Sequence, residues 1–229
     1  MSFEPTEEEK KINAEIKAVY NGGDCGRALE MSIAFLKSHP GALLARYSHA
    51  VMHGDYSYNT AHGPEERKRL LDIAKKEIKT LFEDPNQSSW PEGLRYSTHN
   101  EYFWFFEMPE EQYNLGTEKI KQGLQGNYSA CVGAASMALR QLRSHNLSAA
   151  EEWARKALYH FTSFEEYAPN WYNINYFSAQ AFACLGDYEV ASQSFKGMFR
   201  KQQGPVNAAE VEKFDQLVSE IKGLRDFKK

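Results

Sequence analysis

Apolar residues recur along the chain every three to four positions, which is the period of an amphipathic α-helix. The clearest case follows Pro64, where Leu71, Ala74, Ile78 and Leu81 share one face while charged side chains occupy the other. No segment shows the sustained alternation of apolar and polar residues that marks a half-buried β-strand. The pattern therefore predicts an all-α protein.

Capping and helix-breaking residues divide this pattern into helices. Thr6, with Glu9 three residues later, fits a capping box, so residues 1–6 are expected to form a tail before the first helix. A third helix is expected over 42–53. The turn-forming stretch 54–64 reads as an insertion, and Pro64 is expected to open the next helix.

Domain organisation follows from the same boundaries. Residues 7–229 are expected to form a single helical domain, because helices fill the chain throughout. The segment 84–92, rich in Pro, Ser and Asn, is a candidate hinge or, more simply, a loop between neighbouring helix pairs.

A short motif recurs near both ends of the chain, and it consists of a Gly-Asp turn with Ala four residues after the Asp. It occurs at Gly23, Asp24 and Ala28, and again at Gly186, Asp187 and Ala191. A related spacing, with Asn in place of Asp, is formed by Asn146 and Ala150. These positions, with Pro40 near the N-terminus and Phe195 and Met198 near the C-terminus, resemble the tetratricopeptide repeat over about half of the chain.

The resemblance implies a right-handed solenoid of about five helix pairs with a C-terminal capping helix. It also implies a non-catalytic module that binds a partner protein or peptide along a concave groove formed by the first helix of each pair. The residues that the resemblance places in this groove are Asn13, Lys17, Tyr20, Arg46, His49, Tyr102, Asn173, Tyr176 and Gln180. Stacking of the chain ends into a homodimer is a further expectation.

The aromatic run 102–106 has two interpretations. Five consecutive rings point all around a helix axis, so core packing against neighbours on more than one flank is the simpler interpretation. The alternative is a ligand pocket built with Tyr96, His99 and tyrosines of the insertion. On that alternative the protein is a small-molecule sensor or an enzyme, with its pocket between 54–64 and the helix at 94–107.

Candidate chemistry is sparse. His49 and His53 stand four residues apart, a spacing that can chelate a metal, and Asp55 and His62 nearby could complete such a site. Ordinary polar or partly buried histidines are nevertheless the favoured interpretation. Cys25 precedes the second helix, where a thiol pKa can fall, yet no adjacent residue would activate it. Because nucleophile-elbow, P-loop and dinucleotide-binding motifs are absent from the sequence, neither an enzyme nor a cofactor is expected.

Composition narrows the class of partner. The chain carries 27 basic and 31 acidic side chains, for a net charge of −4, which argues against a dedicated nucleic-acid binder. Its apolar runs are too short to span a membrane, and the acidic N-terminus does not resemble a signal peptide. Three scattered cysteines are typical of reduced thiols, two of them packed between helices, in a cytoplasmic protein.

Overall fold

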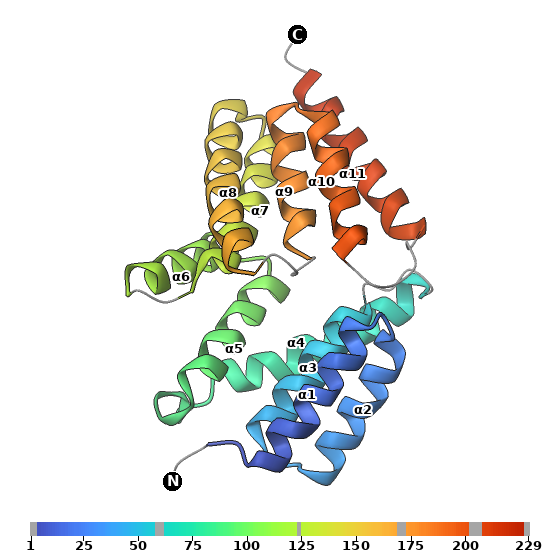
Figure 1. The fold of residues 1–229 in the computed structure, drawn as a ribbon, viewed down its shortest axis with the longest axis vertical. Helices are drawn as coiled ribbons and strands as arrows, with labels where there is room; N and C mark the ends of the chain where they lie inside the picture. Colours follow the sequence, from blue (N-terminus) through green and yellow to red (C-terminus); the bar gives the residue numbers. More distant parts are fainter. Residues whose placement is uncertain (1–3, 58–61, 123–124, 169–172, 202–207, 227–229) are drawn as a thin grey trace. The chain divides into compact units, whose positions relative to one another are not determined.

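The computed structural model describes residues 4–57, 62–122, 125–168, 173–201 and 208–226, and these residues form α-helices, turns and loops with no β-strand. The all-α prediction is therefore confirmed over this part of the chain, and consecutive helices pack against one another (Figure 1). The helices are α1 (Glu7–Asn21), α2 (Cys25–Ser38), α3 (Leu43–Ser57), α4 (Pro64–Phe82), the short 3₁₀ helix η1 (Gln87–Ser89), α5 (Glu92–Phe105), α6 (Pro109–Lys121), α7 (Asn127–Arg143), α8 (Leu147–Tyr167), α9 (Ile174–Leu185), α10 (Tyr188–Lys201) and α11 (Ala208–Asp226).

The chain divides into two compact units, Met1–Glu107 and Met108–Lys229. The 84–92 segment lies inside the first unit, where Trp90 is buried in an apolar cluster of α3, α4 and α5. Gln87 also ties this segment to the end of α4, because its side-chain nitrogen donates to the carbonyl oxygens of Leu81 and Phe82 at 2.8 Å each. Within the described residues, no helix combines the length and apolarity needed to cross a membrane.

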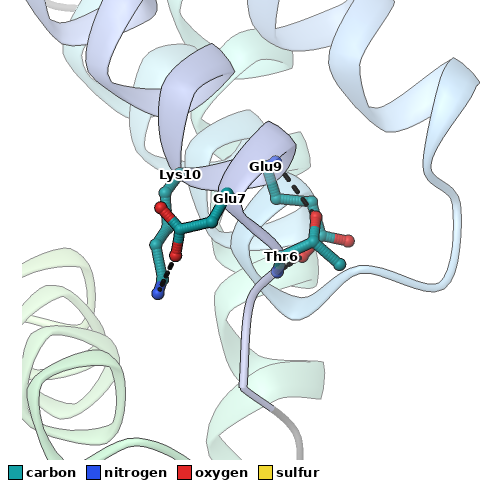
Figure 2. A network of polar contacts seen from close by, with 4 residues as sticks. All are labelled: Thr6, Glu7, Glu9 and Lys10. Atoms are coloured by element: carbon teal, nitrogen blue, oxygen red, sulfur yellow. Dashed lines mark hydrogen bonds and ion pairs between the residues drawn. The ribbon is translucent and has the colours of Figure 1, made fainter.

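The first helix begins at the capping box that the sequence predicts. The Thr6 hydroxyl accepts a hydrogen bond from the Glu9 backbone nitrogen at 3.2 Å, and the Glu9 carboxylate accepts one from the Thr6 nitrogen at 2.8 Å (Figure 2). Glu7 and Lys10 form an exposed ion pair of 2.8 Å beside it. Two N–H groups that the helix cannot satisfy itself are thus paired, which sets where α1 starts.

Three tight turns share one construction. The turn residues Asp24, Asn146 and Asp187 each accept a hydrogen bond from the backbone nitrogen three residues later, at 3.0, 3.2 and 3.2 Å. The residue before each has a positive φ, with values of 89° at Gly23, 57° at His145 and 87° at Gly186. The alanine four residues on is fully buried in every case, at Ala28, Ala150 and Ala191. The six residues of the recurring motif therefore specify where one helix ends, where the next helix begins and where a small side chain packs against a neighbouring helix.

This construction predicts the effect of removing one cap. Asp24→Ala is expected to lower the free energy of unfolding by about 1 kcal/mol, because the Arg27 backbone N–H loses its acceptor. Asp24→Ser keeps an acceptor oxygen and is expected to retain most of the stability. Urea denaturation of both variants measures the difference, and an equal loss in both would contradict the capping role.

In the first unit, α3 lies at the centre and contacts α1, α2, α4 and α5. Its two sides carry different parts of the core. One cluster joins it to α1, α2 and α4, and it includes Ile16, Phe35 and Leu70. The other joins it to α4 and α5, and it includes Ile78 and Phe105. Because α3 lies between these clusters, side chains from all the other α-helices of the unit pack against it.

The third helix is longer than the sequence predicts, since it continues past His53 to Ser57. Gly54 lets the Phe105 ring of α5 pack directly against this end of α3. A Cβ at position 54 would lie 2.2 Å from the nearest atom of that ring. The end of α3 is held by Arg67 of α4, whose Nε donates to the Ser57 carbonyl oxygen at 3.1 Å. Part of the expected 54–64 insertion is thus helix, while residues 58–61 lie outside the described residues.

The aromatic run at the end of α5 packs against its own unit. Phe105 is 1% exposed, and Tyr102 stacks on Phe82 of α4 with ring centroids 3.8 Å apart and planes 6° from parallel. Trp104 and Phe106 are partly buried against the same cluster. Core packing is therefore the observed role of most of these rings, and Phe103 completes the group by meeting Phe82 edge to face.

The second unit is built around the small-residue helix α7, which contacts α6, α8, α9 and α11. Gly116 of α6 and Gly133 of α7 lie where the two backbones nearly touch. The last helix, α11, contacts α7 and α9 rather than only its chain neighbour. Its Phe214 stacks on Phe195 with centroids 4.1 Å apart, and its Glu220 pairs with Arg143 at 2.7 Å. Through these contacts, α11 covers one side of α7 and α9.

The cysteines are distributed as the sequence predicts. Cys131 and Cys184 are buried, which raises the pKa of each thiol, to about 12 for Cys184. Buried thiols of this kind are chemically inert. Cys25 is partly buried at the start of α2, where Asp24 caps the helix.

Candidate functional site

The predicted groove residues of α1 form one stripe, and two of the three link α1 to α3. Ser48 donates a 2.5 Å hydrogen bond to the side-chain oxygen of Asn13. The Tyr20 hydroxyl donates to the carboxylate of Asp55 near the other end of α3. Lys17, between them in sequence, is exposed. Asn13 and Tyr20 therefore hold the two helices together, and Lys17 marks the solvent side of the stripe.

Arg46 and His49 lie on the side of α3 next to α4. The Arg46 guanidinium is 3.8 Å from the carboxylate of Glu77. The ring of His49 is 4.1 Å from that of His53, between centroids, and His53 Nδ1 is 2.8 Å from the His49 carbonyl oxygen. Burial and the neighbouring His53 lower the pKa of His49 to about 4, and burial lowers that of His53. Both rings are consequently neutral at pH 7.

The histidine pair keeps the spacing that a metal site would use. Nδ1 of His49 is buried and has no hydrogen-bond partner among the described residues. Over the same part of the chain, however, three or more His, Cys, Asp or Glu side chains are nowhere gathered closely enough to bind a metal. The pair thus offers at most two ligands, where a structural zinc site needs four.

The predicted residues of the second unit are packed by the chain itself. Gln180 is 5% exposed, and its side-chain nitrogen donates to the carbonyl oxygen of Ala135 at 2.8 Å. Tyr176 meets the ring of Phe214 of α11 edge to face at 6.1 Å, and burial raises the pKa of its hydroxyl. Asn173 is partly buried at the start of α9 and makes no side-chain cap bond. Substituting Tyr176 or Gln180 would therefore disturb packing.

Tyr102 also lies in packing, since its ring stacks on Phe82 and tilts against Phe106 at 4.5 Å. It remains partly exposed on α5. The predicted residues of the first unit thus come from α1, α3 and α5, as the resemblance implies. One of them, Tyr20, bonds to the first of two acidic side chains that the predicted groove does not include.

These side chains are Asp55 of α3 and Glu101 of α5, which we call the acidic pair. Burial raises the pKa of Asp55 to about 6, although the Tyr20 hydroxyl opposes the shift. Burial and the charge of Asp55 raise the pKa of Glu101 to about 8, against a weak 3.4 Å hydrogen bond from Asn100. Two carboxyl groups that disfavour each other's charge, each partly exposed, are brought together where α3 and α5 meet.

The acidic pair has few partners for its oxygens. Among the described residues, Tyr20 is the donor found for Asp55 and Asn100 the donor found for Glu101. A carboxylate accepts up to about four hydrogen bonds, so these protein donors fill only part of this capacity. Every Lys and Arg of the first unit lies in its described part, and none of them forms an ion pair with either carboxylate. The site therefore carries negative charge without a counter-ion from its own unit.

A third polar group lies on the same face of α5. Thr98 precedes Glu101 by three residues, so both project from one side of the helix. Phe105, four residues after Glu101, packs that side against Gly54, the neighbour of Asp55. Thr98 is fully buried, and its hydroxyl oxygen has no hydrogen-bond partner among the described residues. An unsatisfied buried hydroxyl thus lies on the same helix face as Glu101, which makes this face a candidate ligand site.

The sequence contains only a weak signal for this site. Asp55 stands among turn formers and reads as a loop residue, whereas Glu101 reads as an ordinary charged position before the aromatic run. The two are 46 positions apart, and no motif joins them. What could have drawn attention to Glu101 is its place between apolar helical neighbours, on a helix face expected to be buried. Comparison of the chain with protein-family models, with curated proteins and with solved structures found no match.

Proposed function

We propose that this protein is a helical-repeat module of the tetratricopeptide type that binds a partner protein or peptide. The binding face is formed by α1, α3 and α5 of the first unit. The module is non-catalytic and needs no cofactor. The proposal is supported by the construction of the turns, by the packing of the first helices of successive pairs, and by the chemistry of the acidic pair.

The turns support a repeat. The residues that open α6, α8 and α10 are Met108, Asn146 and Asp187, which stand 38 and 41 residues apart, counted from 108 to 146 and from 146 to 187. Each follows a residue with positive φ. Both spacings exceed the about 34 residues of a tetratricopeptide repeat, and the second is the longer because α8, which lies within it, has 21 residues. The eleven α-helices of the described chain equal five pairs and a terminal helix.

Helix packing supports the choice of face. In the first unit, α3 contacts both α1 and α5, so the first helices of successive pairs lie next to one another (Figure 1). In the second unit the equivalent helices are α7 and α9, and α11 packs on both. Because the chain itself covers α7 and α9, the face of the first unit is the better candidate for a partner.

The observation that carries the proposal is the uncompensated acidic pair on α3 and α5. Like-charged groups that are kept together and partly buried lower stability, so their presence is more typical of a binding site than of a structural core. The alternative of a small-molecule pocket between 54–64 and α5 is less well supported. Phe105 fills the apolar space beside Gly54 that such a pocket would need.

A selection experiment tests the proposal. The full chain is used to select binders from a library of displayed peptides, and the selected peptides are then offered to two variants that carry a photo-crosslinking residue. One variant replaces exposed Lys17 of α1, and the control replaces exposed Lys196 of α10. Selected peptides are expected to share a sequence pattern and to crosslink at position 17.

Two outcomes would remove the proposal: selection that enriches no common pattern, or crosslinking that occurs at position 196 and not at position 17. The mass of the chain in solution is measured alongside. A homodimer formed through the α1, α3 and α5 face would protect position 17 and would show as intermolecular crosslinks between two copies.

A further inference from the structure

We propose that Asp55 and Glu101 hold the guanidinium group of an arginine side chain supplied by the bound partner. This inference rests on the proposed peptide-binding function and names the chemistry that the site selects. Three observations on the first unit carry it: the missing counter-ion, the unused acceptor capacity of the two carboxylates, and the unpartnered hydroxyl of Thr98.

The missing counter-ion defines the charge of the ligand. The acidic pair would carry two negative charges when both groups ionise, and no basic side chain of its own unit pairs with either. Each carboxylate has one hydrogen-bond donor among the described residues. A cation that brings several N–H donors would satisfy both the charge and the acceptor positions that these protein donors leave, in a single contact.

The arrangement favours guanidinium over a compact cation. The carboxylates come from two different helices, α3 and α5, so they approach a ligand from separate directions. A guanidinium group presents five N–H donors in a rigid plane and can bridge two carboxylates, whereas an ammonium group offers three donors from a single point. The Thr98 hydroxyl, fully buried on the Glu101 side of α5, can accept one of the remaining N–H groups.

A metal ion fits less well. Divalent cations in proteins take six or more oxygen ligands, or four ligands for zinc. The acidic pair supplies two carboxylates, and the described residues contain no group of three or more His, Cys, Asp or Glu side chains that could hold a metal. An organic cation that carries its own rigid array of donors needs fewer protein ligands.

The test compares three peptide pools that differ at one position. Each pool has randomised flanks around a central arginine, lysine or citrulline, and citrulline keeps the shape of arginine without its charge. The full chain is expected to retain the arginine pool about 10- to 100-fold better than the citrulline pool, with the lysine pool between them.

Two near-isosteric variants, Asp55→Asn and Glu101→Gln, assign this preference to the acidic pair. Each is expected to reduce the arginine-to-citrulline ratio by about tenfold, because one charged acceptor is lost. The matched control is Glu30→Gln, which removes a carboxylate from an exposed position on α2 and is expected to leave the ratio unchanged.

Thr98→Val separates a ligand role from a purely structural one. Valine has nearly the shape of threonine and removes the buried hydroxyl that lacks a partner. The variant is therefore expected to melt at a higher temperature than the wild type and yet to prefer arginine less strongly. A structural role alone would change the melting temperature and leave the arginine preference intact.

Equal retention of the arginine and citrulline pools by the wild type would overturn the inference, as would a preference that survives in both acidic-pair variants. Stabilisation of the chain by Zn²⁺, Ca²⁺ or Mg²⁺ alone, lost in both variants, would overturn it in favour of a metal site. If all pools bind equally and still crosslink at position 17, the arginine site fails while the proposed function stands. If no pool binds, both the arginine site and the proposed peptide-binding function are contradicted.

Discussion

Gly133→Ala is expected to disrupt the second unit. A Cβ at this position would lie 2.5 Å from the backbone nitrogen of Tyr113 and 2.6 Å from the carbonyl oxygen of Pro109. Both are backbone atoms of α6, so neither can rotate away as a flexible side chain would. Gly116 is equally confined from the other side, with Ala130 nitrogen 2.4 Å from its Cβ position. The helices would have to separate, at a loss of about 3 kcal/mol or more.

Hydrogen exchange resolved by peptide measures this effect, because a chain with two compact units need not unfold in a single step. Protection is expected to fall in α6 and α7. The matched control is Gly223→Ala on α11, where a Cβ meets no atom within 4 Å. That change is expected to be neutral or to stabilise by up to about 1 kcal/mol. Wild-type protection of α6 and α7 in Gly133→Ala would contradict the close-packing argument.

The parts of the fold that sequence predicts well are those set by local chemistry. The capping box at Thr6 and the turns at Asp24 and Asp187 each need a side-chain oxygen at one position and backbone freedom at another, and both requirements are visible in the residues themselves. The turn before α6 shows the limit. There Glu107 has a φ of 54° and Met108, which has no capping oxygen, opens the helix. Pro109 does indicate from the sequence that a helix begins here, as α6 does, but no turn-forming residue marks the positive φ of Glu107.

The parts that sequence predicts poorly depend on long-range packing. The stretch Gly54–Ser57 reads as a loop because its residues form turns readily, yet tertiary contacts with Phe105 and Arg67 keep it helical. The same contacts bring Asp55 to Glu101. Propensity is a weak guide where a neighbouring helix decides the conformation, and charge partners 46 positions apart leave no periodic signal.

For the candidate site, the resemblance predicts helices that lie next to one another, but it does not predict the contacts that their side chains make. Asn13, Tyr20 and Tyr102 lie on α1 and α5 as implied, but their contacts are with α3 and α4 of the same unit. A repeat motif specifies which helix is first in each pair. Which side chains on that helix face a neighbour depends on crossing angles that a single sequence does not encode.

Replacing both members of the acidic pair, in Asp55→Asn with Glu101→Gln, is expected to stabilise the first unit by about 2–3 kcal/mol at pH 8. In the unfolded chain these groups lose their protons near pH 4. In the folded chain Asp55 holds its proton to about pH 6 and Glu101 to about pH 8. The folded state therefore binds more protons between these limits, and its stability falls as the pH rises from about 4 to about 8. The double variant removes this fall.

The histidines of α3 act in the opposite direction, which makes the two effects separable. Because the pKa of His49 is lowered to about 4, the unfolded chain binds more protons than the folded chain below about pH 6.5, and stability falls as the pH decreases. His53, with Arg69 and Glu77 of α4 near it, contributes in the same sense. Hydrogen exchange of α3 and α5 amides, corrected for intrinsic exchange and measured from pH 5 to pH 8, is expected to show protection that falls toward pH 8 in the wild type. In the double variant the alkaline fall should disappear while the acid fall remains, and Glu30→Gln should follow the wild type. An unchanged alkaline fall in the double variant would mean that Asp55 and Glu101 ionise normally, and it would contradict their burial next to each other.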